Sequence, residues 1–188
     1  MPFLRISLTR ADKRHPFLVV SDNSGTALLE FAITLPVLLM LYLGCVQICD
    51  VVSVYRKTTT TSRTIVDLAS QQTTVSDGDL DSILAASSQV MAPHSTANLK
   101  MVVTQVTVDS AGVATVDWSR ASGSGATADT TASTYTLPSG VAINGTSLVI
   151  AKVNYGYLAD IGGLLRTDIP LADTIYMYPR SVAKIPKT

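Results

Sequence analysis

The feature that most constrains this chain is an apolar run near its N-terminus. Phe31 to Cys49 is a stretch of nineteen residues without a charge, flanked by Glu30 and Asp50. As a helix it would extend roughly 29 Å, which matches a hydrocarbon core of about 30 Å. Pro36 lies inside the run, but membrane helices tolerate proline because the freed carbonyl is satisfied by a local adjustment. The sequence therefore predicts one transmembrane helix.

Two other interpretations of this run compete with a membrane span. A buried helix of a soluble core seldom runs this long without a polar face. A secretory signal peptide would share the basic N-terminal region, but its apolar segment is usually about 7–15 residues long and is followed by a small-residue cleavage site. The signal peptide is the alternative interpretation.

The composition agrees with a chain that is partly in lipid. Charged side chains make up 15% of the 188 residues, and 14 basic residues balance 14 acidic ones. Soluble domains carry about 25% charged residues. Because its basic and acidic residues are equal in number, the chain also lacks the excess of Lys and Arg that a phosphate-binding surface needs. We therefore expect no nucleic-acid partner.

The sequence on either side of the run predicts its orientation. Four basic residues precede it within residues 1–25, and three follow it within residues 50–67. The positive-inside tendency then places the N-terminus in the cytoplasm. The region beyond residue 73 has no Cys and is rich in Ser, Thr, Ala, Gly and Val, as exported bacterial domains often are. We therefore expect a single-pass protein of the bacterial inner membrane with an exported C-terminal domain.

The junction before the run contains Gly25, Thr26, Glu30 and Phe31. Glycine leaves helical geometry at little cost, which allows an extended, protease-accessible bond. The junction resembles a prepilin processing site, which a membrane peptidase cuts after the glycine. The resemblance implies that residues 1–25 are a cleaved leader and that Glu30 pairs with the new N-terminal amine, its own or that of the next subunit. The simpler interpretation of Glu30 is a carboxylate that favours a helix N-terminus.

The resemblance extends over residues 25–69, through Glu30-Phe31-Ala32, Pro36, a Leu-rich run, Arg63 and Ala69. This stretch resembles the TadE-like family, pilin-related components of the tight-adherence (Tad or Flp) pilus. The resemblance implies a non-catalytic minor pilin or assembly factor without a cofactor. Its implied partners are a prepilin peptidase, other pilin-like subunits, the pilus assembly platform and inner-membrane lipid. Four threonines at 58–61 depart from the usual alanines, and threonine is a poor helix former.

The helix is expected to serve as both membrane anchor and polymerisation surface. The side chains predicted to pack against lipid or neighbouring helices are Phe31, Ile33, Leu35, Pro36, Leu38, Leu39 and Leu43.

The fold class predicted for the whole chain is α+β. A stem helix is expected over 26–73, followed over 74–188 by one or two helices on a mostly antiparallel sheet of four or five strands. The second helix is predicted to begin at Ser76 or Asp77 and to end near Ala92. Predicted strands cover 99–108, 113–118, 141–143, 147–157 and 174–178, with a hairpin turn at Asn144-Gly145. The small polar residues of 121–136 predict a mobile loop.

Few residues outside the junction suggest a catalytic, disulfide or metal-binding role. Cys45 and Cys49 lie within the apolar run and are predicted to be packing residues rather than a disulfide framework. His15 and His94 are isolated, and the alternating aspartates 77, 79 and 81 suit a helix start better than a calcium loop. We therefore expect no metal site.

A Ser-x-x-Lys spacing occurs at Ser181 and Lys184, as in acylating enzymes, but the accompanying motifs of those enzymes are missing. Two alternatives to a minor pilin follow from the sequence. One is a single-span accessory protein of the pilus or secretion apparatus that never polymerises. The other is an anchored envelope hydrolase that uses Ser181, supported by this spacing alone.

Overall fold

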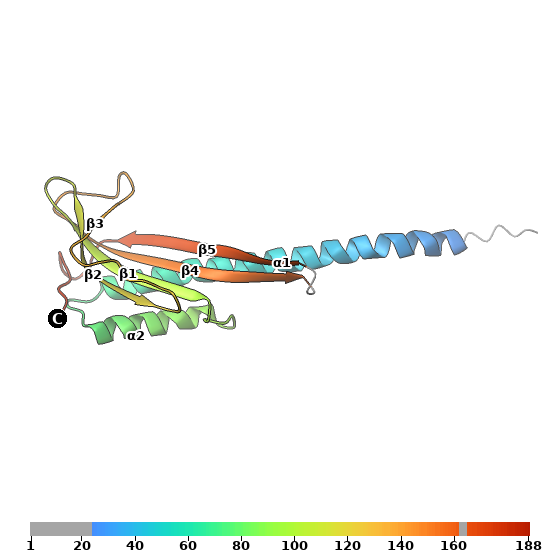
Figure 1. The fold of residues 1–188 in the computed structure, drawn as a ribbon, viewed down its shortest axis with the longest axis horizontal. Helices are drawn as coiled ribbons and strands as arrows, with labels where there is room; N and C mark the ends of the chain where they lie inside the picture. Colours follow the sequence, from blue (N-terminus) through green and yellow to red (C-terminus); the bar gives the residue numbers. More distant parts are fainter. Residues whose placement is uncertain (1–23, 162–164) are drawn as a thin grey trace, which may run out of the picture. The chain divides into compact units, whose positions relative to one another are not determined.

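The structure is a computed structural model that describes residues 24–161 and 165–188. Residues 1–23 of the predicted leader lie outside the described residues. In order, the elements are α1 (Ser24–Ser70), α2 (Asp77–Ser88), the 3-10 helix η1 (Gln89–Met91), β1 (Leu99–Val108), β2 (Ala114–Ser122), β3 (Thr134–Tyr135), β4 (Ser147–Ile161) and β5 (Leu165–Met177) (Figure 1). The predicted α+β class is confirmed.

Helix α1 is continuous through both Pro36 and the threonine run. Its hydroxyl groups bond within the helix: each donates to the carbonyl four residues earlier, at Thr58, Thr60, Thr61, Ser62 and Thr64. At Thr58, Thr61 and Ser62, which are buried, this bonding gives the hydroxyl group a partner. The threonines therefore continue the helix, although their intrinsic propensity is poor.

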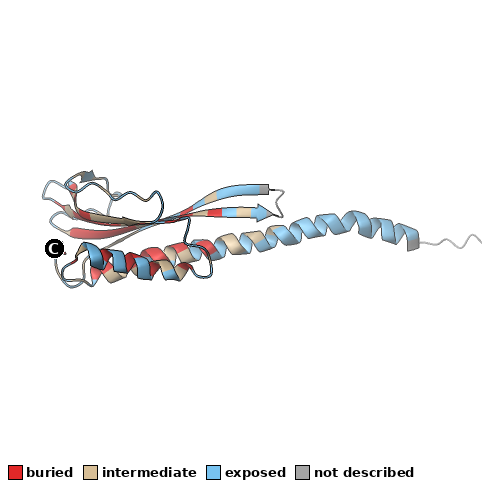
Figure 2. Ribbon diagram, turned by 60° about the horizontal axis from the view of Figure 1, so that its bottom comes forward, coloured by how far each residue is buried: buried red, intermediate tan, exposed pale blue. Residues whose placement is uncertain are grey.

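Burial along α1 changes from one half to the other, as the colours of Figure 2 show. Residues 25–43 are all exposed. The second half lies within the compact unit Tyr42–Thr188 and buries one stripe at helical spacing. The stripe consists of Val54, Thr58, Thr61, Ser62, Ile65, Val66, Ala69 and Ser70. Only the second half is thus a core helix of the domain.

The sheet has the strand order β3-β2-β1-β4-β5, and all neighbouring strands are antiparallel. Helix α2 and the second half of α1 lie on the same side of it (Figure 2). The main core between helices and sheet joins side chains such as Ile65, Leu84, Val103, Trp118 and Val153. Strand β4 alternates between the two faces: Val149, Ala151 and Val153 join this core, whereas Leu148 and Ile150 face the other way.

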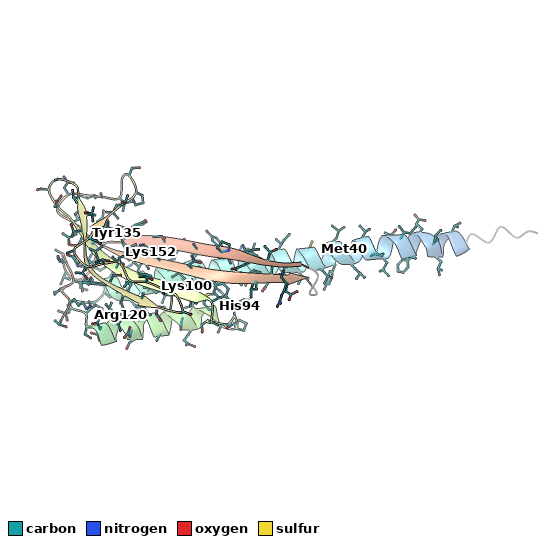
Figure 3. All side chains as sticks on the ribbon, in the orientation of Figure 1. Met40, His94, Lys100, Arg120, Tyr135 and Lys152 are labelled. Atoms are coloured by element: carbon teal, nitrogen blue, oxygen red, sulfur yellow. The ribbon has the colours of Figure 1, made fainter. Side chains whose placement is uncertain are left out.

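The outer face of the sheet carries a smaller apolar cluster and an anchored loop. Asp129, in the loop predicted to be mobile, accepts hydrogen bonds from Thr104 (2.7 Å) and Lys152 (3.1 Å). The Lys152 ammonium also lies 4.7 Å from the centre of the Tyr135 ring, and Figure 3 labels both residues. The loop is therefore tied to the sheet at Asp129, while its mobility elsewhere stays a prediction.

Helix α2 begins where the sequence indicated. Ser76 is the N-cap and forms a capping box with Asp79, whose carboxylate accepts a hydrogen bond from the Ser76 backbone amide. Asp81 binds the Arg120 guanidinium through two bonds of 2.7 and 2.6 Å, linking the helix to β2. The aspartates thus serve the helix and its contact with the sheet.

One predicted strand is wrong. Residues 141–143 form no strand, and β4 pairs with β1 and β5 instead. Asn144-Gly145 is a turn, but it packs on the end of the β1–β2 hairpin: Gly145 donates its amide hydrogen to the Val108 carbonyl, and the Asn144 side chain donates to the Ser110 carbonyl. The turn forms and the strand expected after it is present as β4, but the strand expected before it is not.

The C-terminal segment after β5 closes the domain. The Trp118 indole donates a hydrogen bond of 2.9 Å to the Ile185 carbonyl, and the Ile185 amide donates to the Gln105 side chain. A parallel bridge pairs Val75 with Lys187. The buried Ile185 side chain thus fixes the chain end against both layers.

Candidate functional site

The predicted junction lies on the first turns of α1. Gly25 is helical, and a Cβ atom placed on it would meet no atom within 4 Å. Packing in the described structure therefore does not require glycine at this position. Glu30 lies exposed one turn further along, and its backbone carbonyl accepts a 2.7 Å hydrogen bond from the Thr34 hydroxyl.

The apolar surface of α1 covers all sides of the helix. All seven predicted packing residues are exposed, and Phe31 is 61% exposed. Met40, in the same apolar run and labelled in Figure 3, is 74% exposed. A helix that is apolar on every side requires an apolar environment. Within the described residues, α1 is the one helix long and apolar enough to cross a membrane.

Polar groups join helix and sheet at the end of the apolar run. The Gln47 side-chain amide donates to the Tyr157 hydroxyl, which in turn donates to the Asp50 carboxylate; both distances are 2.5 Å. Burial first, and then the bond to Asp50, raises the pKa of Tyr157 to about 12. Tyr157 therefore stays protonated and donates this bond at neutral pH.

Two further contacts hold α1 to the domain. The Lys57 ammonium donates to the carbonyls of Val90 and Ala92, at the end of η1. Near the other end of the helix, Arg180 binds the Asp67 carboxylate at 2.8 Å. Together with Tyr157, these side chains fix the second half of α1 against the sheet and the α2 end.

The sequence of this helix is similar to a known family. A family model described as TadE-like protein matches residues 25–67. Residues 25–67 are a TadE-like segment. The match begins at Gly25, includes Glu30 and Pro36, and ends within the stripe that α1 buries in the domain. The match spans less than a quarter of the 188-residue chain, so it describes the helix and not the whole protein.

No curated protein matches the chain, and no solved structure matches it. The TadE-like match lies within α1 and does not extend to α2 or the sheet. The arrangement of α2 and the five strands is therefore known here from the structure alone.

The candidate residues for chemistry have structural roles in the described part of the chain. Ser181 donates its hydroxyl hydrogen to the Gln71 carbonyl at 2.8 Å, whereas Lys184 binds the Asp117 carboxylate. The serine and the lysine therefore have separate partners. Cys45 and Cys49 are free and exposed. In the described residues, no group of three or more His, Cys, Asp or Glu could hold a metal ion.

The contacts at the base of the helix were not found from the sequence. The sequence pattern identifies Asp50 only as the charge that ends the apolar run, and Tyr157 only as a strand residue. Their proximity depends on the packing of β4 against α1, because the two residues lie 107 positions apart in the chain. No local pattern reports such a contact.

Proposed function

We propose that this chain is a pilin-like subunit or assembly factor of a Tad-type pilus that acts by assembly and not by catalysis. The observation that carries the proposal is the TadE-like match, which starts at Gly25 and continues along one helix that is exposed and apolar in its first half. The inner membrane is its proposed location, with the N-terminus in the cytoplasm and the sheet domain exported.

Processing is the first step of the proposed function. A prepilin peptidase removes the leader after Gly25 and leaves Thr26 as the N-terminus. The coincidence of this bond with the start of the family match supports the step.

Glu30 gives the second step its specificity. A carboxylate at the head of an apolar helix is costly in lipid unless it finds a partner. The free amine of Thr26, in the same chain or in a neighbouring subunit, supplies an opposite charge. A slip in register would leave both charges unpaired, so the pair sets the position of one stem against the next.

The apolar side chains then determine when the helix leaves the membrane. Burying one large apolar side chain is worth roughly 1.5–3 kcal/mol relative to water. A helix with this many exposed apolar side chains remains in lipid until neighbouring stems replace the lipid. Extraction therefore needs the assembly platform and other pilin-like subunits, and without them the protein stays anchored.

The two alternatives differ in what supports them. An anchored accessory protein that never polymerises is compatible with the same helix and the same processing. An anchored hydrolase requires Lys184 to activate Ser181. The contacts of these residues favour a structural role, because Ser181 binds the Gln71 carbonyl and Lys184 binds Asp117.

The decisive experiment is the intact mass of the protein extracted from membranes of cells with and without the prepilin peptidase. We expect a chain that starts at Thr26 only when the peptidase is present. Gly25→Ile should retain the leader, whereas the control Gly44→Ala, in the same helix and also with open space around it, should be processed normally. Full-length protein in cells with active peptidase would refute the processing step.

If the protein is processed, a second experiment must distinguish a filament subunit from an accessory protein that never polymerises. Recovery of the Thr26 form in sheared filaments identifies a filament subunit. Its retention in the membrane fraction of a piliated strain identifies the accessory protein.

A further inference from the structure

Strand β5 has a free edge. Of the strands that the structure describes, it is the last in the sheet, and β4 is its neighbour, as Figure 1 shows. Edge strands are usually kept from pairing with other chains by a lysine, a proline or a bulge. Residues 171–177 of β5 contain no lysine and no proline, and their register with β4 is unbroken. The edge is therefore open to an added strand.

The hydrogen bonds of Gly156 show which backbone groups of β5 face this edge. On the side away from β5, the Gly156 amide donates to the Asn98 carbonyl, and the Gly156 carbonyl accepts from the Asn98 side chain. Residues opposite each other in an antiparallel pair either bond to each other or both point outward. Pro170, which lies opposite Gly156, therefore points its backbone groups away from β4. This agrees with its lack of an amide hydrogen.

Every second residue of a strand points its backbone groups to the same side. The amides and carbonyls of Ala172, Thr174 and Tyr176 therefore face the free edge. Within the described residues, these groups take part in no backbone hydrogen bond outside the sheet. They are one amide and one carbonyl on each of three residues, spread over about 14 Å of strand. An antiparallel strand can bond to all of them.

Two charges of opposite sign lie on the helix side of the edge. Asp173 faces that side, because its opposite residue Val153 belongs to the core. Its buried Oδ2 atom has no hydrogen-bond partner in the described structure. Arg63 is exposed on α1 and has no ion pair or hydrogen bond with any described residue. Arg63 lines a groove of about 430 Å³, whose β5 wall is formed by Ile175 and Met177.

These charges select the side chains of an added strand. Opposite residues of an antiparallel pair share a face and have Cβ atoms about 4.5–5.5 Å apart. A residue opposite Ile175 would lie over the groove of Arg63, which suits an acid, because Asp67 in the same groove is bound to Arg180. A residue opposite Asp173 should be basic. Along an antiparallel strand, the acid then comes two positions before the base.

The β5 edge of a second copy does not fit. Met177, near the end of β5, contacts Ser70 at the end of α1. Ile169 lies opposite Tyr157, which contacts Asp50 earlier in α1. Strand β5 thus runs in the direction of α1, so antiparallel pairing of two β5 strands would set the two helices in opposite directions. Two copies anchored by this helix in one membrane cannot pair so, and residues 171–177 have no base to meet Asp173.

We propose that the free edge of β5 binds an extended segment of a different protein, which adds an antiparallel strand over residues 172–176 and has an acidic residue two positions before a basic one. Backbone hydrogen bonds supply the affinity, and Asp173 and Arg63 supply the selection. The binding edge lies within the sheet unit and requires neither leader processing nor a pilus. Its failure is therefore distinguishable from a failure of the proposed function.

The probe for this edge is the fluorescently labelled heptapeptide Val-Thr-Glu-Thr-Lys-Thr-Val, added to the full chain in detergent. The control peptide has Glu and Lys exchanged. Anisotropy should show at least about tenfold tighter binding of the probe, because the exchange places like charges together. Asp173→Asn should reduce this preference. If that variant does not fold, N-methylated probes test the wild type: methylation of the fourth amide, which faces β5, should abolish binding, whereas methylation of the fifth should not.

Amide hydrogen exchange, followed by NMR, locates the bound strand. The amides of Ala172, Thr174 and Tyr176 should exchange fast in the free chain and become protected with the probe, whereas those of Asp173 and Ile175 are protected throughout. No binding, equal binding of the two peptides, or binding that leaves the three edge amides exchanging fast would overturn the proposal. Protection that appears without the probe and grows with protein concentration would indicate a second copy on the edge and would also overturn it.

Discussion

The Tyr157 hydroxyl on β4 donates a hydrogen bond to the Asp50 carboxylate on α1 across 2.5 Å. Asp50 is the first charged residue after the apolar run, so this bond joins the sheet to the helix where the lipid-exposed half of α1 ends. Gln47, still inside the run, donates to the same hydroxyl. The Tyr157 hydroxyl thus links two polar side chains of α1 to the sheet.

This coupling predicts a specific pH dependence. Burial and the Asp50 carboxylate raise the pKa of Tyr157 to about 12, whereas an unfolded tyrosine titrates near about 10. The resulting stability is fully present below about pH 10 and is lost as the pH rises through about 12. We expect Tyr157→Phe to lower the free energy of unfolding by about 1 kcal/mol at neutral pH and to weaken its decline in alkaline solution.

Urea unfolding of the full chain in detergent can measure this effect. The chain has a single tryptophan, and Trp118 is 2% exposed, so its fluorescence reports the domain core. Tyr178→Phe is the matched control, since Tyr178 is 42% exposed. An alkaline decline that is identical in wild type and Tyr157→Phe would contradict the assignment.

The threonine run predicts opposite effects at neighbouring positions. Thr60 is exposed, so Thr60→Ala should stabilise the domain by about 0.5 kcal/mol through helix propensity. Thr58 is fully buried, and Thr58→Ala should destabilise it by about 1 kcal/mol, the value of one buried methyl group. Thermal unfolding of both variants gives the signs; a stabilising Thr58→Ala would mean that α1 does not pack as described.

The C-terminal segment predicts a large effect from a residue near the chain end. Ile185 is fully buried between the layers. Ile185→Ala should cost about 3 kcal/mol because it leaves a cavity. Ile143→Ala, at a residue that is 53% exposed, should change stability by less than about 0.5 kcal/mol. Similar unfolding midpoints for the two variants would show that the segment does not contribute to the core.

The sequence predicted the elements whose signals are local. The apolar run predicted a long apolar helix, alternation predicted β1 at its observed bounds, and Ser76 marked the start of α2. These predictions succeeded because periodicity and capping depend on residues a few positions apart.

The length of β5 could not be predicted in the same way. Pro170 lies inside the strand, and a proline argues against a strand interior because it has no amide hydrogen. Strand β5 tolerates it because it is an edge strand, paired with β4 alone. The position of a strand in the sheet is a property of the topology, which the local sequence does not report.

A glycine in the outer loop predicts a steric effect. Gly123 has φ of +108°, and a Cβ on it would lie 2.0 Å from the Leu99 carbonyl oxygen. Gly140 has φ of +88° but open space around it, so it separates backbone strain from the clash. We expect Gly140→Ala to cost about 1 kcal/mol and Gly123→Ala clearly more, measured by urea unfolding. An equal loss of stability in the two variants would show that Gly123 does not lie against the Leu99 carbonyl oxygen as described.

Glu30 provides the test of assembly. Removing a carboxylate from the head of an apolar helix lowers the cost of inserting it, so Glu30→Ala should retain membrane insertion. If the carboxylate pairs with the amine of a neighbouring subunit, the same variant should weaken association with partner pilins at least about tenfold, which corresponds to about 1.4 kcal/mol. Thr34→Val, one turn further along the helix, is the control. Co-purification from membranes and the pilin content of sheared filaments measure the two variants, and normal pilus output from Glu30→Ala would argue against the pairing.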